Sequence, residues 1–311
     1  MPLDPAIATI LDQVNTFTAA PIRTTDPAVL REAERLLRGT ADGAPPIVIG
    51  SVEDAAVPGP AGDVPVRVYR PAGEGPAPTV VFFHGGGWIT GDLDSHDLVT
   101  RRLCHDVGAV VVAVHYRRAP EHPFPAPLDD CLAVTRHIAA HIGDYGGRRD
   151  RLAVAGDSAG ANLAAVIAQT FRDEGLPLAA QFLAYPPTDF DGAYPSRAEN
   201  ATGYMLTAEN IADIQHLYAG DDPAVRTSPR VSPLRAARLT GLAPAIVATA
   251  RYDPLRDEGQ AYAQALQDAG VDVFVRDYEG LIHGFLNMFP VSPAADAAVG
   301  ELCAELRARL R

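Results

Sequence analysis

Short apolar runs alternate with longer amphipathic stretches over most of this chain. Residues 78–85 (PTVVFFHG) and 108–116 (GAVVVAVHY) are almost continuously apolar, which is typical of strands buried on both faces of a parallel sheet. Residues 64–71 alternate apolar and polar side chains, as a half-exposed strand does. The same criteria predict further strands at 151–158, 179–186, 244–254 and 271–280.

Helical stretches separate the predicted strands. Their apolar residues recur every three or four positions and predict helices at 127–142, 159–175, 257–270 and 294–310. This alternation of strand and helix predicts an α/β protein, with a mostly parallel central sheet and helices on both of its faces.

Two segments fall outside this alternation. Residues 1 to about 45 are predicted to form two helices, at 5–17 and 26–39. Residues about 188–225 are too many for a simple connection in a compact domain, and we expect them to be helical as well. We therefore predict that the two segments form a helical cap over the sheet, within a single domain that spans residues 1–311.

Composition and charge narrow the class of protein. The chain has 311 residues, 47% of them hydrophobic and 21% charged, which is ordinary for a globular protein and fits one large α/β domain. The formal net charge of −13 argues against nucleic acid or an anionic membrane surface as a partner.

The sequence carries no recognisable targeting or anchoring segment. The first residues include Asp4 and Asp12 and lack a basic region, so they do not resemble a signal peptide. No uninterrupted apolar run reaches the roughly 18 residues that a membrane helix needs. We therefore expect a cytoplasmic protein without stable membrane insertion.

The cysteines do not indicate a metal site or a disulfide framework. Cys104, Cys131 and Cys303 are odd in number and form no CxxC pair. We expect each to be a buried, small apolar residue, and we expect no metal and no cofactor.

A candidate nucleophile lies where the strand at 151–158 meets the helix at 159–175. Gly156, Ser158 and Gly160 form a G-x-S-x-G motif there, in which a tight turn would expose the serine hydroxyl above the sheet edge. The motif alone is common by chance and also fits an ordinary turn. Its position between a strand and a helix favours the functional interpretation.

A serine needs a base, and the base needs an orienting acid. His283 follows the last predicted strand, and it is the only histidine after Ser158 that lies outside the predicted cap. Asp253 follows the apolar strand residues 245–250 and gives the order Ser–Asp–His that is typical of one hydrolase class. Asp257 and Glu258 are the main rivals, but we expect them to cap the next helix.

Three consecutive glycines follow the strand at 78–85, within the stretch HGGGW at 84–88. A P-loop is excluded because no G-K-[ST] follows, and the spacing is not that of a dinucleotide-binding loop. Glycine amides free of side chains can approach a substrate oxygen closely. The run therefore indicates an oxyanion hole, where each such amide can contribute about 3–4 kcal/mol.

With these residues assembled, the chain resembles the hormone-sensitive-lipase-like family of α/β-hydrolases, in the GDSAG subgroup of bacterial family IV esterases. The motifs that match in order and approximate spacing are HGGGW (84–88), YRRAPEHPFPAPLDD (116–130), GDSAG (156–160), DPLRDEG (253–259) and HGF (283–285). The resemblance covers essentially the whole chain. One departure is Arg118, where the family motif usually has leucine.

The resemblance implies a role for each matching residue. The catalytic residues would be Ser158, Asp253 and His283, and the oxyanion hole would be formed by Gly86, Gly87 and Ala159 with Gly85 supporting the turn. His84 would shape the glycine loop, and Glu121 and His122 would belong to a buried loop behind the site. The family also implies short- to medium-chain acyl esters as substrates, no cofactor, and a possible homodimer through the edge strand at 271–279.

We therefore predict a serine carboxylesterase that acts on small-molecule esters. Trp88, Tyr204, Met205 and Leu206 are candidates for the wall of its substrate pocket. An amide-directed hydrolase with the same triad, resembling an arylformamidase, is the alternative that the sequence leaves open. A ligand-binding protein of this fold that has lost its base is disfavoured, because serine, aspartate and histidine are all present.

Overall fold

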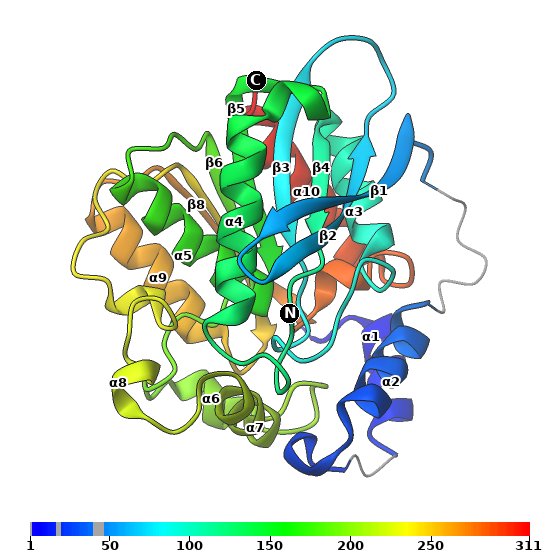
Figure 1. The fold of residues 1–311 in the computed structure, drawn as a ribbon. Helices are drawn as coiled ribbons and strands as arrows, with labels where there is room; N and C mark the ends of the chain where they lie inside the picture. The colour runs from blue at the N-terminus through cyan, green and yellow to red at the C-terminus, as the bar shows by residue number, and fades with distance from the viewer. Residues whose placement is uncertain (1, 17–19, 40–46) are drawn as a thin grey trace.

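The computed structural model describes residues 2–16, 20–39 and 47–311, and one eight-stranded sheet runs through this part of the chain (Figure 1). The strand order is β1-β2-β4-β3-β5-β6-β7-β8, with β1, β2 and β4 paired antiparallel and all later neighbours parallel. The strands are β1 (Ser51–Gly59), β2 (Gly62–Arg70), β3 (Ala77–Phe83), β4 (Val110–Val114), β5 (Gly147–Asp157), β6 (Ala180–Ala184), β7 (Ala245–Tyr252) and β8 (Val273–Ile282).

All seven predicted strands are present, and β1 is the strand that the sequence analysis missed. It is the outermost strand, and most of its side chains are exposed, so its apolar pattern is weak. Polar residues and Pro58 are tolerated there because an edge strand needs few inward-facing side chains.

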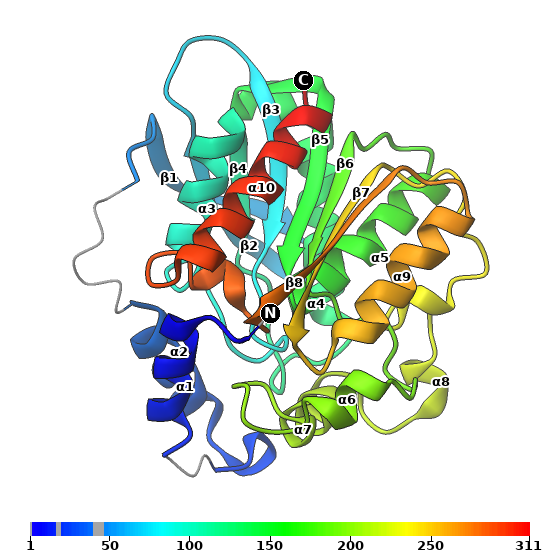
Figure 2. The same ribbon diagram turned by 180° about the vertical axis from the view of Figure 1, so that it is seen from behind.

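Helices cover both faces of the sheet, as predicted (Figures 1 and 2). One face carries α4 (Ala126–Ala140), α5 (Ala159–Asp173) and α9 (Arg256–Asp268), and the other carries α3 (Asp97–Leu103), a following π-helical turn (Cys104–Gly108) and α10 (Pro293–Arg309). The short α3 was not predicted.

The central strands are apolar on both sides because each side has its own hydrophobic core. In β3, Val81 and Phe83 face the core under α4 and α5, while Val80 and Phe82 face the core under α3 and α10. All four side chains are fully buried. The continuous apolar run at 78–85 therefore has the two-sided burial that the sequence predicted.

The remaining helices lie beyond the carboxyl ends of the parallel strands (Figure 1). They are α1 (Pro5–Val14), α2 (Pro27–Gly39), α6 (Pro195–Glu199), α7 (Ala208–Ala219) and α8 (Pro223–Arg226), with 3₁₀ turns at Ile22–Thr24, Pro233–Arg235 and Phe285–Asn287. A further 3₁₀ turn, Ile142–Tyr145, lies at the opposite end of the sheet and leads into β5.

The two segments that carry these helices touch each other. The Asn15 side chain donates to the Gly203 carbonyl at 3.1 Å, and the Arg23 amide donates to Asp213 at 3.0 Å. Residues 1, 17–19 and 40–45 of the predicted cap lie outside the described residues.

The three cysteines are buried and unpaired, as expected. No helix in the described ranges is long and apolar enough to cross a membrane.

Candidate active site

Ser158 lies on a strained turn between β5 and α5. Its backbone has φ +52° and ψ −120°, a conformation that side-chain-bearing residues rarely adopt. A Cβ atom on Gly160 would overlap the carbonyl of Phe83, and one on Gly156 would overlap the backbone of Gly160. The two glycines are therefore needed for strand and helix to approach closely enough to form this turn.

His283 and Asp253 meet Ser158 at the carboxyl edge of the sheet. His283 Nε2 lies 2.8 Å from Ser158 Oγ, and His283 Nδ1 lies 2.8 Å from Asp253 Oδ2. Asp253 is fully buried, and its other carboxylate oxygen accepts the Leu255 amide at 2.8 Å. This arrangement favours the tautomer with the proton on Nδ1, which leaves Nε2 able to accept the serine proton.

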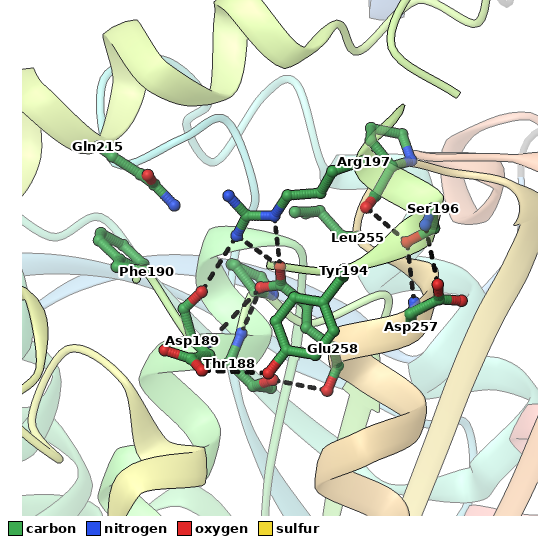
Figure 3. A network of polar contacts seen from close by, with 12 residues as sticks. Thr188, Asp189, Phe190, Tyr194, Ser196, Arg197, Gln215, Leu255, Asp257 and Glu258 are labelled. Carbon is green, nitrogen blue, oxygen red and sulfur yellow. Dashed lines mark hydrogen bonds and ion pairs between the residues drawn. The ribbon is translucent and has the colours of Figure 1, made fainter. Parts of the chain in front are cut away.

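The two rival carboxylates bind partners other than the histidine. Asp257 and Glu258 lie in the first turn of α9, yet they bind a different segment and do not cap their own helix. Asp257 accepts the Ser196 amide at 2.8 Å, and Glu258 accepts the Thr188 amide at 2.8 Å (Figure 3). The prediction that they cap the helix is therefore wrong, because neighbouring backbone amides outside the helix compete for their oxygens.

Glu258 is buried in a polar network at the base of the segment 188–200. Arg197 Nη2 donates to Glu258 Oε2 at 2.6 Å (Figure 3). Burial nevertheless raises the pKa of Glu258 to about 7, against the opposing effects of Arg197 and of the Thr188 amide. The network joins α9 to the segment that leads into α6 and α7.

The glycine loop is fixed by its own backbone. The Gly85 amide donates to Asp157 Oδ1 at 2.8 Å, and the amides of Ile89 and Thr90 donate to the Gly86 carbonyl at 3.0 and 2.9 Å. Gly86 has φ +109°, and a Cβ atom there would lie 2.6 Å from the Thr90 carbonyl. Only glycine fits this conformation without strain.

His84 shapes this loop, as the family resemblance implied. Its Nδ1 lies 2.8 Å from the Gly85 carbonyl, and its ring stacks on Tyr116 with centroids 4.2 Å apart. Burial holds the pKa of His84 well below its ordinary value. A buried, neutral imidazole that contacts the glycine loop fits a structural role.

The expectation for Glu121 and His122 is wrong, because both are exposed. Glu121 receives two hydrogen bonds of 2.7 Å from Arg31 of α2, and this contact lowers the pKa of Glu121 to about 2. The segment thus connects to α2 at the surface instead of forming a buried wall. Arg118, the departure from the family motif, donates to the Gly91 carbonyl.

A cavity of about 680 Å³ opens in front of Ser158 and His283. Its walls come from the sheet edge, from α1 and α2, and from α7. Of the candidate pocket residues, Trp88, Met205 and Leu206 are among those that line it. Tyr204 is a correction, because it is not among the lining residues and its ring lies 5.1 Å from that of Tyr252 instead.

Sequence reasoning missed part of the cavity wall, including Phe190, Ile214 and Gln215. The signal was present in α7, where Ile211, Ile214 and Gln215 follow at the three- and four-residue spacing of one helix face. Gln215 is a polar residue on this otherwise apolar face, and it indicated that the face borders a cavity and not only the hydrophobic core.

Within the described ranges, no group of three or more His, Cys, Asp or Glu residues could hold a metal ion. The serine, histidine and aspartate side chains instead provide a nucleophile with a base and an orienting carboxylate. Next to them, the glycine loop and the first turn of α5 present backbone amides.

This fold and this site together define an α/β hydrolase. The family model described as the alpha/beta hydrolase fold matches residues 80–287, and the chain belongs to this family. The predicted membership of the hormone-sensitive-lipase-like branch is thereby confirmed.

Individual relatives are similar over most of their length. The carboxylic ester hydrolase LipN of Mycobacterium tuberculosis is 42% identical over 99% of this chain and 83% of its own. The carboxylesterase NlhH of the same organism is 44% identical over 80% of this chain and 79% of its own. The solved structure of a hyperthermophilic esterase from Pyrobaculum calidifontis superposes with a TM-score of 0.93 at 39% identity, covering 99% of both chains.

Proposed function

We propose that this protein is a serine carboxylesterase in which Ser158 is the nucleophile, His283 the general base and Asp253 the residue that orients the imidazole. Carboxylic ester hydrolysis is the activity of this chain, given its identity of 42% and 44% to named ester hydrolases. The observation that carries the assignment of residues is the relay of two 2.8 Å contacts from Ser158 through His283 to Asp253, at the wall of a largely apolar cavity.

In the first half of the reaction, Ser158 Oγ attacks the ester carbonyl carbon while His283 Nε2 takes the hydroxyl proton. The tetrahedral intermediate collapses, the alcohol leaves with that proton, and the acyl group remains on Ser158. In the second half, a water molecule gives a proton to His283 and attacks the acyl carbon. The acid is released, and the proton returns to Ser158.

The amides of Gly86, Gly87 and Ala159 bind the oxyanion of each tetrahedral intermediate, with Gly85 supporting the turn. The hydrogen bonds of the Gly85 amide and of the Gly86 carbonyl support this proposal, because they hold the loop in place before substrate arrives. No reorganisation is then needed as charge develops on the substrate oxygen.

Within a single domain that spans residues 1–311, the described parts of the segments 1–45 and 188–225 form the cap, and the cap closes the cavity over short- to medium-chain esters. Trp88, Met205 and Leu206 contact the substrate. The placement of these segments beyond the carboxyl ends of the strands supports the proposal (Figure 1).

We also infer that the protein is cytoplasmic, because free cysteines are favoured in a reducing compartment. We further infer a homodimer that forms through β8, the last strand of the sheet.

The decisive variant is Ser158→Ala. We expect kcat for p-nitrophenyl butanoate to fall by at least about 10⁴-fold, because no other group supplies the nucleophile. Ser51→Ala, which changes an exposed serine at the start of β1, is the matched control and should retain full activity. Equal rates for the wild type and Ser158→Ala would refute the assignment.

A further inference from the structure

The loop that carries Asp253 begins at an irregular end of β7. This strand pairs in regular parallel register with β8 up to Ala250, and the register shifts between Ala250 and Tyr252. On its other side, β7 pairs with β6 as far as Ala248. The backbone carbonyls that follow therefore need hydrogen-bond donors from outside the regular ladder of the sheet.

The Asn200 side chain provides such a donor to two of these carbonyls. Its Nδ2 atom donates to the Arg251 carbonyl at 3.2 Å and to the Asp253 carbonyl at 3.1 Å. Carbonyl oxygens can only accept, so the Asn200 atom that faces them is the amide nitrogen, whose two hydrogens match the two carbonyls. Asn200 directly follows α6 and is 4% exposed. One buried side chain thus holds the backbone on both sides of Tyr252.

Ser196 adds to this contact from the same helical turn. The Asn200 amide donates to the Ser196 carbonyl at 2.9 Å, so the two side chains leave α6 together. Ser196 Oγ donates to the Pro254 carbonyl at 2.9 Å and accepts the Asp257 amide at 3.2 Å (Figure 3). Three successive acceptors of the Asp253 loop are therefore held by two side chains of the segment 188–225.

The position of this loop fixes the position of the Asp253 carboxylate. Its Oδ2 lies 2.8 Å from His283 Nδ1, and its Oδ1 accepts the Leu255 amide at 2.8 Å. Both oxygens have fixed partners, so a movement of the backbone moves the carboxylate relative to the imidazole. A misplacement of about 1 Å can lower the rate of an enzymatic reaction by about 10²-fold.

We propose that Asn200 is a positioning residue for Asp253, and that the segment 188–225 thereby supports the chemical step as well as enclosing the substrate. Asn200 does not line the cavity, so it acts through the Asp253 backbone and not through contact with the ester. This inference rests on the proposed function, because that function makes Asp253 the residue that orients His283.

The test is a double-mutant cycle between Asn200 and Asp253, measured on p-nitrophenyl butanoate with Ser158→Ala as the background rate. Asn200→Ala leaves each of the two carbonyls one donor, because Arg256 donates to both at 3.1 Å, and we expect this variant to fold. Its kcat should fall about tenfold, as a displacement smaller than 1 Å would cause, and its KM should stay within about twofold of the wild type.

The second arm of the cycle asks whether this effect passes through Asp253. Asp253→Ala alone should lower kcat by about 10⁴-fold, because the imidazole loses the group that orients it. Adding Asn200→Ala to Asp253→Ala should lower kcat by less than about twofold more, since no carboxylate is left to position. A residue that only stabilised the fold would lower activity by the same factor in both backgrounds.

Two further variants make the test specific. Asn200→Asp keeps the size of the side chain but presents oxygens to both carbonyls, so it should lower kcat at least as much as Asn200→Ala. Asn15→Ala removes the same kind of contact, from an exposed asparagine to the Gly203 carbonyl, at another point of the segment 188–225. This control should retain the wild-type kcat. Thermal unfolding verifies that each variant is folded.

An equal loss of kcat for Asn200→Ala with and without Asp253 would overturn the inference. An effect confined to KM, or wild-type kinetics in both Asn200 variants, would overturn it as well. These results leave the proposed function intact as long as Ser158→Ala and Asp253→Ala are both defective. Full activity in Asp253→Ala would instead refute the proposed role of Asp253, and this inference with it.

Discussion

At the scale of single residues, the backbone of Gly86 is the most exacting part of the candidate site. Its φ of +109° and the nearby Thr90 carbonyl leave no space for a side chain. Gly86→Ala should therefore move the amide away from the substrate oxygen and lower kcat by about 10²-fold or more, with a smaller effect on KM. Steady-state kinetics on p-nitrophenyl butanoate measures both constants.

Gly203→Ala is a suitable control for Gly86→Ala. Gly203 also has a positive φ, +87°, but a Cβ atom there meets nothing within 4 Å, and the residue lies outside the glycine loop. The control should bear a similar backbone strain without the kinetic defect. A change in KM alone for Gly86→Ala would contradict the placement of this amide in the oxyanion hole.

The residues that we propose as catalytic could be located from the sequence because their chemistry is tied to positions that a sequence pattern can find. Ser158, Asp253 and His283 each follow a recognisable strand, and parallel strands bring their carboxyl ends to one edge. The place of Gln215 in the cavity wall was not predictable, since it depends on which face of α7 meets the cavity.

At the scale of elements, two arginine side chains attach α2 to the loops that follow β3 and β4: Arg35 donates to Asp92 at 2.7 Å, and Arg31 makes the larger set of contacts. Arg31 Nε donates to the Ile89 carbonyl at 2.9 Å, and Arg31 also holds Glu121. Arg31→Ala should loosen α2, which forms part of the cavity wall, and raise KM for hexanoate and longer acyl esters several-fold. We expect little change in kcat, because the relay residues lie on the sheet. An acyl-chain-length series measures this effect.

The control for Arg31→Ala is Arg70→Ala, which removes a surface ion pair with Glu53 at the far edge of the sheet. Such exposed pairs contribute little, and its kinetics should match the wild type. A fall in kcat without a change in KM for Arg31→Ala would show that α2 supports the chemistry and not the substrate.

Elements were easiest to predict where burial was strongest. The two-sided apolar run of β3 is unmistakable, whereas β1 carries Glu53 and Asp54 outward at the sheet edge and so resembles a loop. Glu121 was expected to be buried on the strength of a matching motif, but it is exposed. A matching motif gives the order of the residues, but not which of them reaches solvent.

At the scale of the whole molecule, Glu258 makes stability depend on pH. Its pKa, raised by burial to about 7 from an ordinary 4.5, means that the folded protein retains a proton that the unfolded chain has lost between these values. The free energy of unfolding should therefore contain a component that is fully present below about pH 4.5 and is lost as pH rises through 7. Its size is on the order of 3 kcal/mol.

Glu258→Gln should remove this pH-dependent part of the free energy of unfolding, because the glutamine amide cannot ionise. Urea unfolding at pH 5, 6, 7 and 8 gives the two free-energy profiles, with Glu53→Gln as a control at an exposed glutamate. The free energy of unfolding of Glu258→Gln should therefore increase relative to that of the wild type as pH rises from 5 to 8. Parallel profiles would show that Glu258 is already ionised throughout this range.

The position of His283 near the end of the chain also bears on biosynthesis. Ser158 and the glycine loop are synthesised before β8, whereas His283, the proposed base, is synthesised only after it. A ribosome-bound or prematurely terminated polypeptide that stops before β8 thus carries a serine without its base. Under the proposed mechanism, hydrolytic competence therefore arises only once the residues after β8 have been synthesised, and a polypeptide that lacks them should not hydrolyse esters.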